Sequence, residues 1–217
     1  MSFTVIDAPQ RSPEWFAARA GRLTSSVADV LFARGKKEGV ESVQRRDLRI
    51  RLALERLTGQ SCDDYGCVTA DMQRGIEDED AARRAYESVT GSLVQSSGFI
   101  ALNAHQAGTS LDGHVGMFDG VVEIKCPKPA IHLSYLRTRE IPPAYVPQIR
   151  HHLWVTGAQW ADWVSFNRQM PAGLQMVIYR ASRADLNMGG YEEAALAFLA
   201  EVAREVSELE AMARARA

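Results

Sequence analysis

The sequence predicts a mixed α/β (α+β) fold in which a mixed central sheet is flanked by helices. Helical patterns fill the first part of the chain, a cluster of short strand patterns follows, and a helix, two strands and a long helix complete it. Grouped helices and strands are typical of helices packed on a partly antiparallel sheet. The 217 residues fit one domain, so we expect a single unit with N-terminal helices at 12–57, a core at about 70–180 and a C-terminal helix at 191–214.

Four helices are expected before the strands. Ser12 is a typical N-cap and Pro13 a typical first helical residue, which predicts a helix to about Gly21. The run 24–26 has the composition of a second cap, ahead of a helix at about 27–31. Helices are also expected at 41–57 and 71–86, with a loop at 58–69 between them. The 41–57 helix is expected to bury one apolar stripe, made of Val43, Ile50, Leu54 and Leu57.

The remaining elements are short strands and two further helices. Strands are expected at 93–94, 99–102, 111–113 and 121–125, and the Asp119-Gly120 pair predicts a turn before the last of these. A helix is expected at about 145–155, strands at 160–167 and 174–179, and a closing helix at 191–214 with apolar residues at helical spacing.

Composition excludes several classes of protein. The net charge is −2 and 46% of residues are hydrophobic, which argues against gross disorder and against coating nucleic acid by bulk charge. No apolar run approaches the ~18 residues of a membrane span, and the N-terminus does not resemble a signal peptide, so we expect a cytoplasmic protein without a membrane partner. Three cysteines are too few for a disulfide framework. No GxxxxGK loop is present, so no nucleotide cofactor is expected.

Basic residues are concentrated between Arg34 and Arg56, where eight cations stand against four acids. Such a run forms either a solvated helix face or one wall of a groove that follows a phosphate backbone. The sequence leaves both interpretations open.

The segment with the clearest chemistry contains Asp112, Glu123 and Lys125. Side chains alternate along a strand, so Glu123 and Lys125 share one face. If Asp112 lies on the neighbouring strand, the two carboxylates converge, and a hard cation such as Mg²⁺ would relieve their repulsion. Lys125 would then stand where negative charge develops. The alternative is a surface hairpin with the Glu123–Lys125 pair in solvent.

Four ordered motifs, spread over about residues 12–180, resemble the phage lambda-type 5′→3′ exonucleases, the viral-recombinase branch of the PD-(D/E)XK nucleases. Together they are far more specific than any one of them. The first motif is Trp15 with RAGRLTSS at 19–26, which resembles W…R-x-G-x-(I/L)-T-(A/G)-S. The second is Gly75-x-x-x-Glu79-x-x-Ala82. The third is SLDG at 110–113 with EIKCP at 123–127, and the fourth is YVPQI at 145–149 with LWVT at 153–156.

The resemblance implies a restriction-endonuclease-like PD-(D/E)XK core and a role for each matching position. Asp112 and Glu123 would bind the metal with the Ile124 carbonyl, and Glu79 would reach the ion directly or through water. Lys125 would orient the water or stabilise the transition state, and Gln148 would hold the Lys125 region or the water. A second group would grip the 5′-terminal phosphate: Arg19, Thr24 and Ser26. An arginine with hydroxyls at a helix N-terminus suits an anion. The alternatives are a surface ion pair for Arg19 and simple capping by the hydroxyls.

The chain departs from the family pattern in three places, one of which is Arg150, where the family often has a second Gln. Leu111 replaces a proline, which is tolerable because Asp112 does the chemistry. No carboxylate occurs at 102–105, so either Asn103 or His105 substitutes at a second metal position, or one ion binds tightly. His151 and His152 are expected on the helix surface, or one of them on DNA, because adjacent helical residues face apart. The tryptophans at 154, 160 and 163 are expected to pack beneath the sheet.

The resemblance implies a single exonuclease domain, dependent on Mg²⁺ with Mn²⁺ able to substitute, that degrades one strand of linear double-stranded DNA from the 5′ end. The 3′ single-stranded overhang would serve recombination in a bacterial or phage-infected cell. The resemblance also implies a ring-shaped homotrimer and a single-strand annealing protein as partner. Two alternatives remain: an endonuclease of the same superfamily, and a catalytically silent DNA-end-binding protein.

Overall fold

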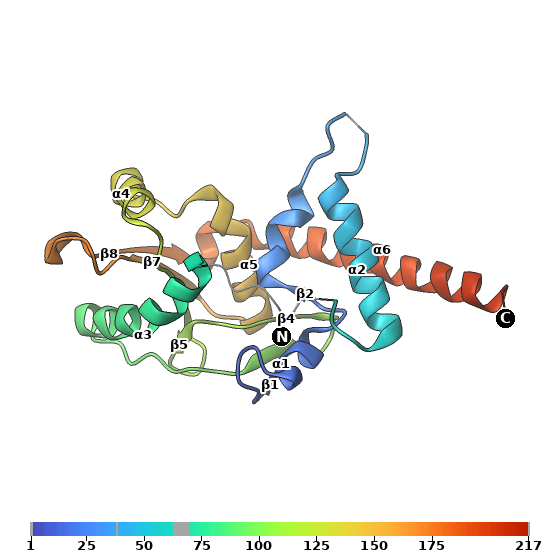
Figure 1. Ribbon diagram of the computed structural model, residues 1–217, viewed down its shortest axis with the longest axis horizontal. Coiled ribbons are helices and arrows are strands. Elements are labelled where there is room, and N and C mark those ends of the chain that lie inside the picture. Colours follow the sequence, from blue (N-terminus) through green and yellow to red (C-terminus); the bar gives the residue numbers. More distant parts are fainter. Residues whose placement is uncertain (1, 38, 63–69, 217) are drawn as a thin grey trace.

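The computed structural model describes residues 2–37, 39–62 and 70–216 (Figure 1). Part of the predicted loop 58–69 therefore lies outside the described residues. The helices and strands are β1 (Phe3–Ile6), α1 (Pro13–Arg19), β2 (Leu23–Thr24), α2 (Val43–Thr58), α3 (Ala70–Thr90), β3 (Phe99–Leu102), β4 (Ala107–Thr109), β5 (Gly113–Val115), β6 (Gly120–Lys125), α4 (Pro129–Thr138), α5 (Val146–Thr156), β7 (Trp160–Phe166), β8 (Met176–Ser182) and α6 (Met188–Arg214), with short 3-10 helices η1 (Ser25–Phe32), η2 (Pro143–Tyr145), η3 (Ala172–Leu174) and η4 (Arg183–Asp185).

The strands form two mixed four-stranded sheets. The first has the order β1-β3-β4-β2, with β2 and β4 parallel and the other pairs antiparallel. The second has the order β5-β6-β7-β8, with β6 and β7 parallel and antiparallel strands at both edges. The parallel β6–β7 pair needs a long crossover, which α4 and α5 supply. The predicted mixed α/β class with helices around the sheet is confirmed.

Helix α5 lies between the two sheets and contacts β3 and β4 of the first as well as β6 and β7 of the second. In Figure 1 it occupies the middle of the molecule, between the β7–β8 pair and the β2–β4 pair. Seven of its residues are buried, from Ile149 through Thr156. A helix that is buried on nearly all sides can present polar side chains to both sheets only if each finds a partner.

Strand β6 sorts its side chains onto two faces. Val121 belongs to the main core, which extends from Leu23 to Val202. Val122 and Ile124 belong to a second cluster beneath α3, together with Tyr86 and residues of β7. The predicted alternation is thus confirmed, and Glu123 and Lys125 share the face that points toward α5.

Several predicted elements are confirmed and others were missed. Ser12 caps α1 by accepting a hydrogen bond from the Trp15 N–H, and the helices and strands expected after residue 119 lie within a few residues of their predicted positions. The expected helix at 27–31 is instead the 3-10 helix η1. Residues 93–94 form no strand, and Asp112 precedes β5 rather than lying within a strand. β1, β4 and α4 were not predicted, because short, locally weak patterns depend on their partners.

The predicted apolar stripe of α2 was wrong. Val43, Leu54 and Leu57 are exposed, whereas Leu48 and Leu52 are buried with Ala53. The long β-branched and aliphatic residues of this helix occur on more than one face, so periodicity alone did not select the buried one.

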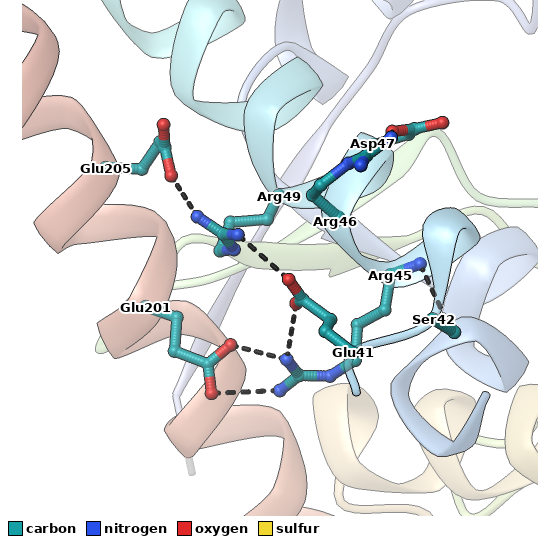
Figure 2. A network of polar contacts seen from close by, with 8 residues as sticks. All are labelled: Glu41, Ser42, Arg45, Arg46, Asp47, Arg49, Glu201 and Glu205. Carbon is teal, nitrogen blue, oxygen red and sulfur yellow. Dashed lines mark hydrogen bonds and ion pairs between the residues drawn. The ribbon is translucent and has the colours of Figure 1, made fainter. Parts of the chain in front are cut away.

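The arginines of α2 explain what holds this helix against α6 (Figure 2). Arg45 makes two hydrogen bonds to Glu201, at 2.6 and 3.0 Å, and a third to Glu41 at 3.0 Å. Arg49 contacts Glu41 and Glu205. Two cations of the basic run, Arg45 and Arg49, therefore form neither a solvated face nor a groove wall, because they are paired with acids of α6 and of the segment before α2.

Within the parts of the chain that the structure describes, no helix is long and apolar enough to cross a membrane.

A buried and an exposed leucine of α2 allow a test of which face of this helix lies in the core. Leu52 is 2% exposed and Leu54 is 41% exposed, on the same helix. Leu52→Ala is expected to lower the free energy of unfolding by about 2–5 kcal/mol, because it leaves a cavity, whereas Leu54→Ala changes it by less than about 1 kcal/mol. Urea titration of the two variants measures both values. Equal losses would contradict the burial described for this helix.

Candidate active site

The centre of the candidate site is Glu123, which is 2% exposed on β6. Its Oε1 accepts hydrogen bonds from the Lys125 ammonium and, at 2.7 Å, from the Gln148 amide. Its Oε2 is 2.8 Å from His152 Nε2. A surface hairpin with this pair in solvent is therefore excluded. Burial opposes ionisation, but Lys125 and His152 outweigh it and lower the pKa of Glu123 to about 2.

His152 is the residue that the sequence analysis placed wrongly. Both His151 and His152 are fully buried, and neither lies on the helix surface. The two rings do point apart, as adjacent helical residues should. His151 contacts the Tyr191 hydroxyl at 2.7 Å and the Gly108 carbonyl at 3.0 Å, whereas His152 contacts Glu123 and Thr109. The available signal was that α5 lies in the crossover of a parallel strand pair, where a helix is covered by the sheet.

Asp112 and Glu79 line a pocket of about 560 Å³, and the Glu123 carboxylate is near enough to raise the pKa of both. Asp112 Oδ2 accepts a hydrogen bond of 2.7 Å from the Ile124 N–H, which ties this loop residue to β6. Glu79 comes from α3, three residues before Ala82 and seven before Tyr86, the buried residues that pack with Val122 and Ile124 of β6. The structure thus brings the carboxylates at 79, 112 and 123 into one neighbourhood.

The charges at this site act on one another. Burial raises the pKa of Asp112 well above its usual range, and the Glu123 carboxylate raises it further. Burial also raises the pKa of Glu79, the Arg83 guanidinium opposes that rise, and Asp80 and Glu123 add to it. Burial opposes the charge of Lys125, but Glu123 and Asp112 outweigh it and raise the pKa of that ammonium. Two cations, Lys125 and Arg83, stand against three acids, so an excess of negative charge remains, which favours a bound positive ion.

The residues present fit a hard divalent cation. Among the described residues, no group of three or more His, Cys, Asp and Glu side chains is arranged to hold a metal ion by itself. Mg²⁺, however, is usually held by one or two carboxylates, with waters and substrate phosphates completing its coordination. The closely spaced Asp112 and Glu123 supply that set. Ile124 contacts Asp112 through its N–H, and a ligand role for its carbonyl oxygen stays a prediction.

A second polar cluster lies at the start of η1. The Arg19 guanidinium lies over the Trp15 ring at 4.1 Å, and one of its nitrogens is 3.5 Å from the Ser26 hydroxyl. The hydroxyls of Thr24 and Ser26 are 3.3 Å apart. Thr24 stands at the N-cap position of η1, but its side chain makes no capping hydrogen bond. The simple capping alternative therefore does not describe Thr24, and the three predicted phosphate-binding residues do lie together.

Ser110 connects the two clusters, and sequence reasoning gave it no role. Its Oγ accepts a hydrogen bond of 2.9 Å from the Trp15 indole, on whose ring Arg19 lies. Asp112 follows only two residues later. The Arg19 cluster is therefore linked through Trp15 and Ser110 to the segment that carries Asp112. The two clusters are close enough to contact neighbouring groups of one ligand.

The remaining predictions are settled by burial and contacts. Trp154 and Trp163 are fully buried, so the prediction that they pack in the core is confirmed for these two. Trp160 is only half-buried, with the Arg180 guanidinium 3.9 Å from its ring centroid. The side chain of Asn103 accepts a hydrogen bond from Thr4, and His105 stacks on Trp154. No contact described for either residue reaches the carboxylate cluster, and the choice between a substituting Asn103 or His105 and a single tightly bound ion stays a prediction.

Three comparisons place these observations among known proteins. Residues 14–159 match the model of the YqaJ-like viral recombinase domain. The structure is similar to that of an alkaline exonuclease, LHK-Exo from Laribacter hongkongensis, at 33% identity and a TM-score of 0.82, covering 95% of this chain and 100% of the other; its complex with dAMP gives 0.83 at the same identity and coverage. A phage-related exonuclease from Haemophilus somnus 129PT shares the fold, at 12% identity, a TM-score of 0.65 and coverage of 87% and 96%. No curated protein matches the chain.

The fold and the site define an enzyme of the nuclease class. More particularly, the match over residues 14–159 shows that the chain belongs to the YqaJ-like viral recombinase family.

Repulsion between the carboxylates generates a stability prediction. Because burial and the Glu123 carboxylate raise the pKa of Asp112, ionising this carboxyl destabilises the folded state above the ordinary pKa of an aspartate. Asp112→Asn removes that charge and keeps an acceptor for the Ile124 N–H. We expect it to raise the thermal midpoint in EDTA by about 2–4 °C, which corresponds to about 1 kcal/mol.

Scanning calorimetry checks this, with the exposed residue Asp29 as control, since Asp29→Asn is expected to leave the midpoint unchanged. Mg²⁺ should stabilise the parental protein more than Asp112→Asn. A lower midpoint for Asp112→Asn in EDTA would contradict the repulsion.

Proposed function

We propose that this chain is a Mg²⁺-dependent 5′→3′ exonuclease that degrades one strand of linear double-stranded DNA and leaves a 3′ single-stranded overhang for recombination. The observation that carries the proposal is the proximity of two unlike clusters. Arg19 and its hydroxyl neighbours suit a terminal phosphate, and Asp112, only two residues after Ser110, suits the metal at the scissile bond.

The chain's own residues divide the chemistry. Asp112 and Glu123 would hold the cation, with Glu79 assisting directly or through water, and the cation supplies an activated water and neutralises charge on the phosphate. Gln148 donates to Glu123 Oε1, the oxygen that also accepts from Lys125, so it would orient the carboxylate and hold the Lys125 region. Lys125 keeps its proton and lies 5.3 Å from the Tyr145 ring centroid, with 26% of its side chain exposed, so it can face the charge that develops during hydrolysis.

Polarity follows from the charge of the 5′ end. A terminal phosphate monoester carries more negative charge than an internal diester, and an arginine with hydroxyls recognises that difference. The Arg19 guanidinium is already ordered by the indole of Trp15, so little conformational freedom is lost on binding. An enzyme that grips the 5′-phosphate cuts the first bond beyond it.

DNA beyond the end requires cations that are not engaged within the fold. Arg34, Lys36 and Lys37 are exposed around a hollow of about 490 Å³ that precedes α2. They provide a local phosphate-binding surface on a chain of net charge −2. The part of the basic run that faces a groove would therefore be this loop, not helix α2.

The comparisons support a DNA-degrading enzyme. LHK-Exo, at 33% identity, is an alkaline exonuclease whose structure is known with dAMP, a deoxynucleotide. Exonucleases of this family generally use divalent metal ions, and Mn²⁺ should substitute for Mg²⁺. The proposal also includes a single exonuclease domain, a ring-shaped homotrimer and a single-strand annealing protein as partner, all of which rest on the family resemblance.

Two other functions have specific competing outcomes. An endonuclease of the same superfamily would cut closed circular DNA, which an end-dependent enzyme leaves intact. A silent end-binding protein would bind ends without product; the close approach of Asp112, Glu123 and Lys125 argues against it, because uncompensated buried charge is costly.

Removing the metal-binding or charge-stabilising group tests the reaction. Asp112→Ala and Lys125→Ala are each expected to lower the rate of nucleotide release by at least about a hundredfold, because they remove a cation ligand and a charge partner of the phosphate. The assay uses linear duplex DNA and a closed circle, in Mg²⁺ and in EDTA. Asp29→Ala serves as the exposed control. Parental rates in either site variant, or cutting of the circle, would overturn the proposal.

Removing the end-recognising cation tests polarity separately. Arg19→Ala is expected to lower the rate on 5′-phosphorylated ends by about 10–100-fold and to leave the rate on 5′-hydroxyl ends nearly unchanged, because a charge-assisted contact is lost. The measurement is the ratio of rates on the two substrates. Arg46→Ala is the control, since Arg46 is exposed on α2 and pairs with the adjacent Asp47. A preference for phosphorylated ends that survives in Arg19→Ala would reject this assignment.

A further inference from the structure

A chain of three buried side chains runs from the first sheet through α5 to the second. Thr109 of β4 and His152 of α5 are fully buried, and Glu123 of β6 is 2% exposed. Thr109 Oγ1 lies 2.7 Å from His152 Nδ1, and His152 Nε2 lies 2.8 Å from Glu123 Oε2. Both distances are those of strong hydrogen bonds.

The direction of the bond to Glu123 follows from the chemistry of the groups. An ionised carboxylate only accepts hydrogen bonds, so His152 Nε2 must carry the hydrogen and donate it to Oε2. The Thr109 hydroxyl occupies the other ring nitrogen and fixes the plane of the ring. A histidine with both nitrogens engaged and no exposed surface has one orientation.

The same contacts limit what Glu123 can do next. Its Oε1 already accepts from Lys125 and Gln148, and Oε2 accepts from His152. A carboxylate offers roughly four acceptor positions, so about one is left for a cation. If the His152 contact is lost, the carboxylate can rotate and its free acceptor position is no longer fixed.

We propose that Thr109 and His152 are positioning residues that fix the Glu123 carboxylate for metal binding. Thr109 also immediately precedes Ser110 and lies three residues before Asp112. The same segment therefore carries the contact of Ser110 with the Trp15 indole, the first member of the Thr109–His152–Glu123 chain, and the Asp112 carboxylate. The inference rests on the proposed metal-dependent function. It concerns how the Glu123 carboxylate is held in place, not which residues bind the ion.

The neighbouring histidine provides a matched control. His151 is equally buried and also has both ring nitrogens engaged, but its partners are Tyr191 and the Gly108 carbonyl, away from Glu123. A purely structural role predicts similar behaviour for variants at 151 and 152. A positioning role predicts that only position 152 changes the properties of the metal site.

The test compares four variants by Mg²⁺ and Mn²⁺ titration calorimetry without DNA and by steady-state nuclease kinetics. His152→Leu, which removes the donor, is expected to weaken metal affinity and lower kcat by about 10–100-fold, with little change in the KM for DNA. His152→Gln, whose amide can donate to Glu123, should recover most of both losses. Thr109→Val should lower both by several-fold, and Thr109→Ser should restore them by returning the hydroxyl.

His151→Gln is the control, expected to lower the thermal midpoint while metal affinity and kcat stay at parental values. Parental metal affinity and kcat in a folded His152→Leu, or equal effects at positions 151 and 152, would overturn the proposal. If His152→Leu does not fold, Thr109→Val and Thr109→Ser test the positioning role in its place. Equal metal affinities for these two variants would reject it. If the parental protein releases no nucleotides, the proposed function fails. The metal affinities of the same variants still test whether Thr109 and His152 position Glu123.

Discussion

The site depends on keeping one buried carboxylate ionised. Removing Glu123 from water is unfavourable unless donors replace the lost hydration. Lys125, Gln148 and His152 provide those donors, one from the same strand and two from α5. Burial raises the pKa of Glu123, but Lys125 and His152 outweigh it and lower that pKa to about 2. Because two of the three come from one helix, the position of α5 between the sheets is a requirement of the chemistry as much as of packing.

That requirement explains why the two sheets are arranged as they are. The parallel β6–β7 pair forces a crossover, and the crossover places α5 against the face of β6 that carries Glu123 and Lys125. The other side of α5 contacts β3 and β4, from which the chain continues through Thr109 and Ser110 to Asp112. The end of one sheet and the middle of the other thus contribute to a single site, while α3 covers the opposite face of β6 and carries Glu79.

Much of this could be predicted from the sequence where the pattern is local. The alternation of β6, the cap of α1 and the composition around Asp112, Glu123 and Lys125 are visible in a few consecutive residues, and these predictions agree with the structure. The role of His152 could not be found in that way, because it depends on a partner 29 residues away and a second partner 43 residues away. The prediction of the buried face of α2 was wrong for the same reason. Leu48 and Leu52 are buried instead of Leu54 because of what packs against them, and Arg45 pairs with an acid of α6 more than 150 residues later.

The pairing of the α2 arginines also bears on how an acidic chain could handle DNA. A cation that is held by a carboxylate inside the fold contributes little to the field outside it, so the run from Arg34 to Arg56 is weaker as a DNA-binding surface than its composition suggests. The carboxylate cluster shows the opposite case. Its acids exceed the cations beside them, and a chain selected only to fold would be more stable with neutral groups at those positions. Charge that is unfavourable without a partner within the fold is compatible with a partner from outside the chain, and the divalent cation of the proposed function would have the chemistry that fits these acids.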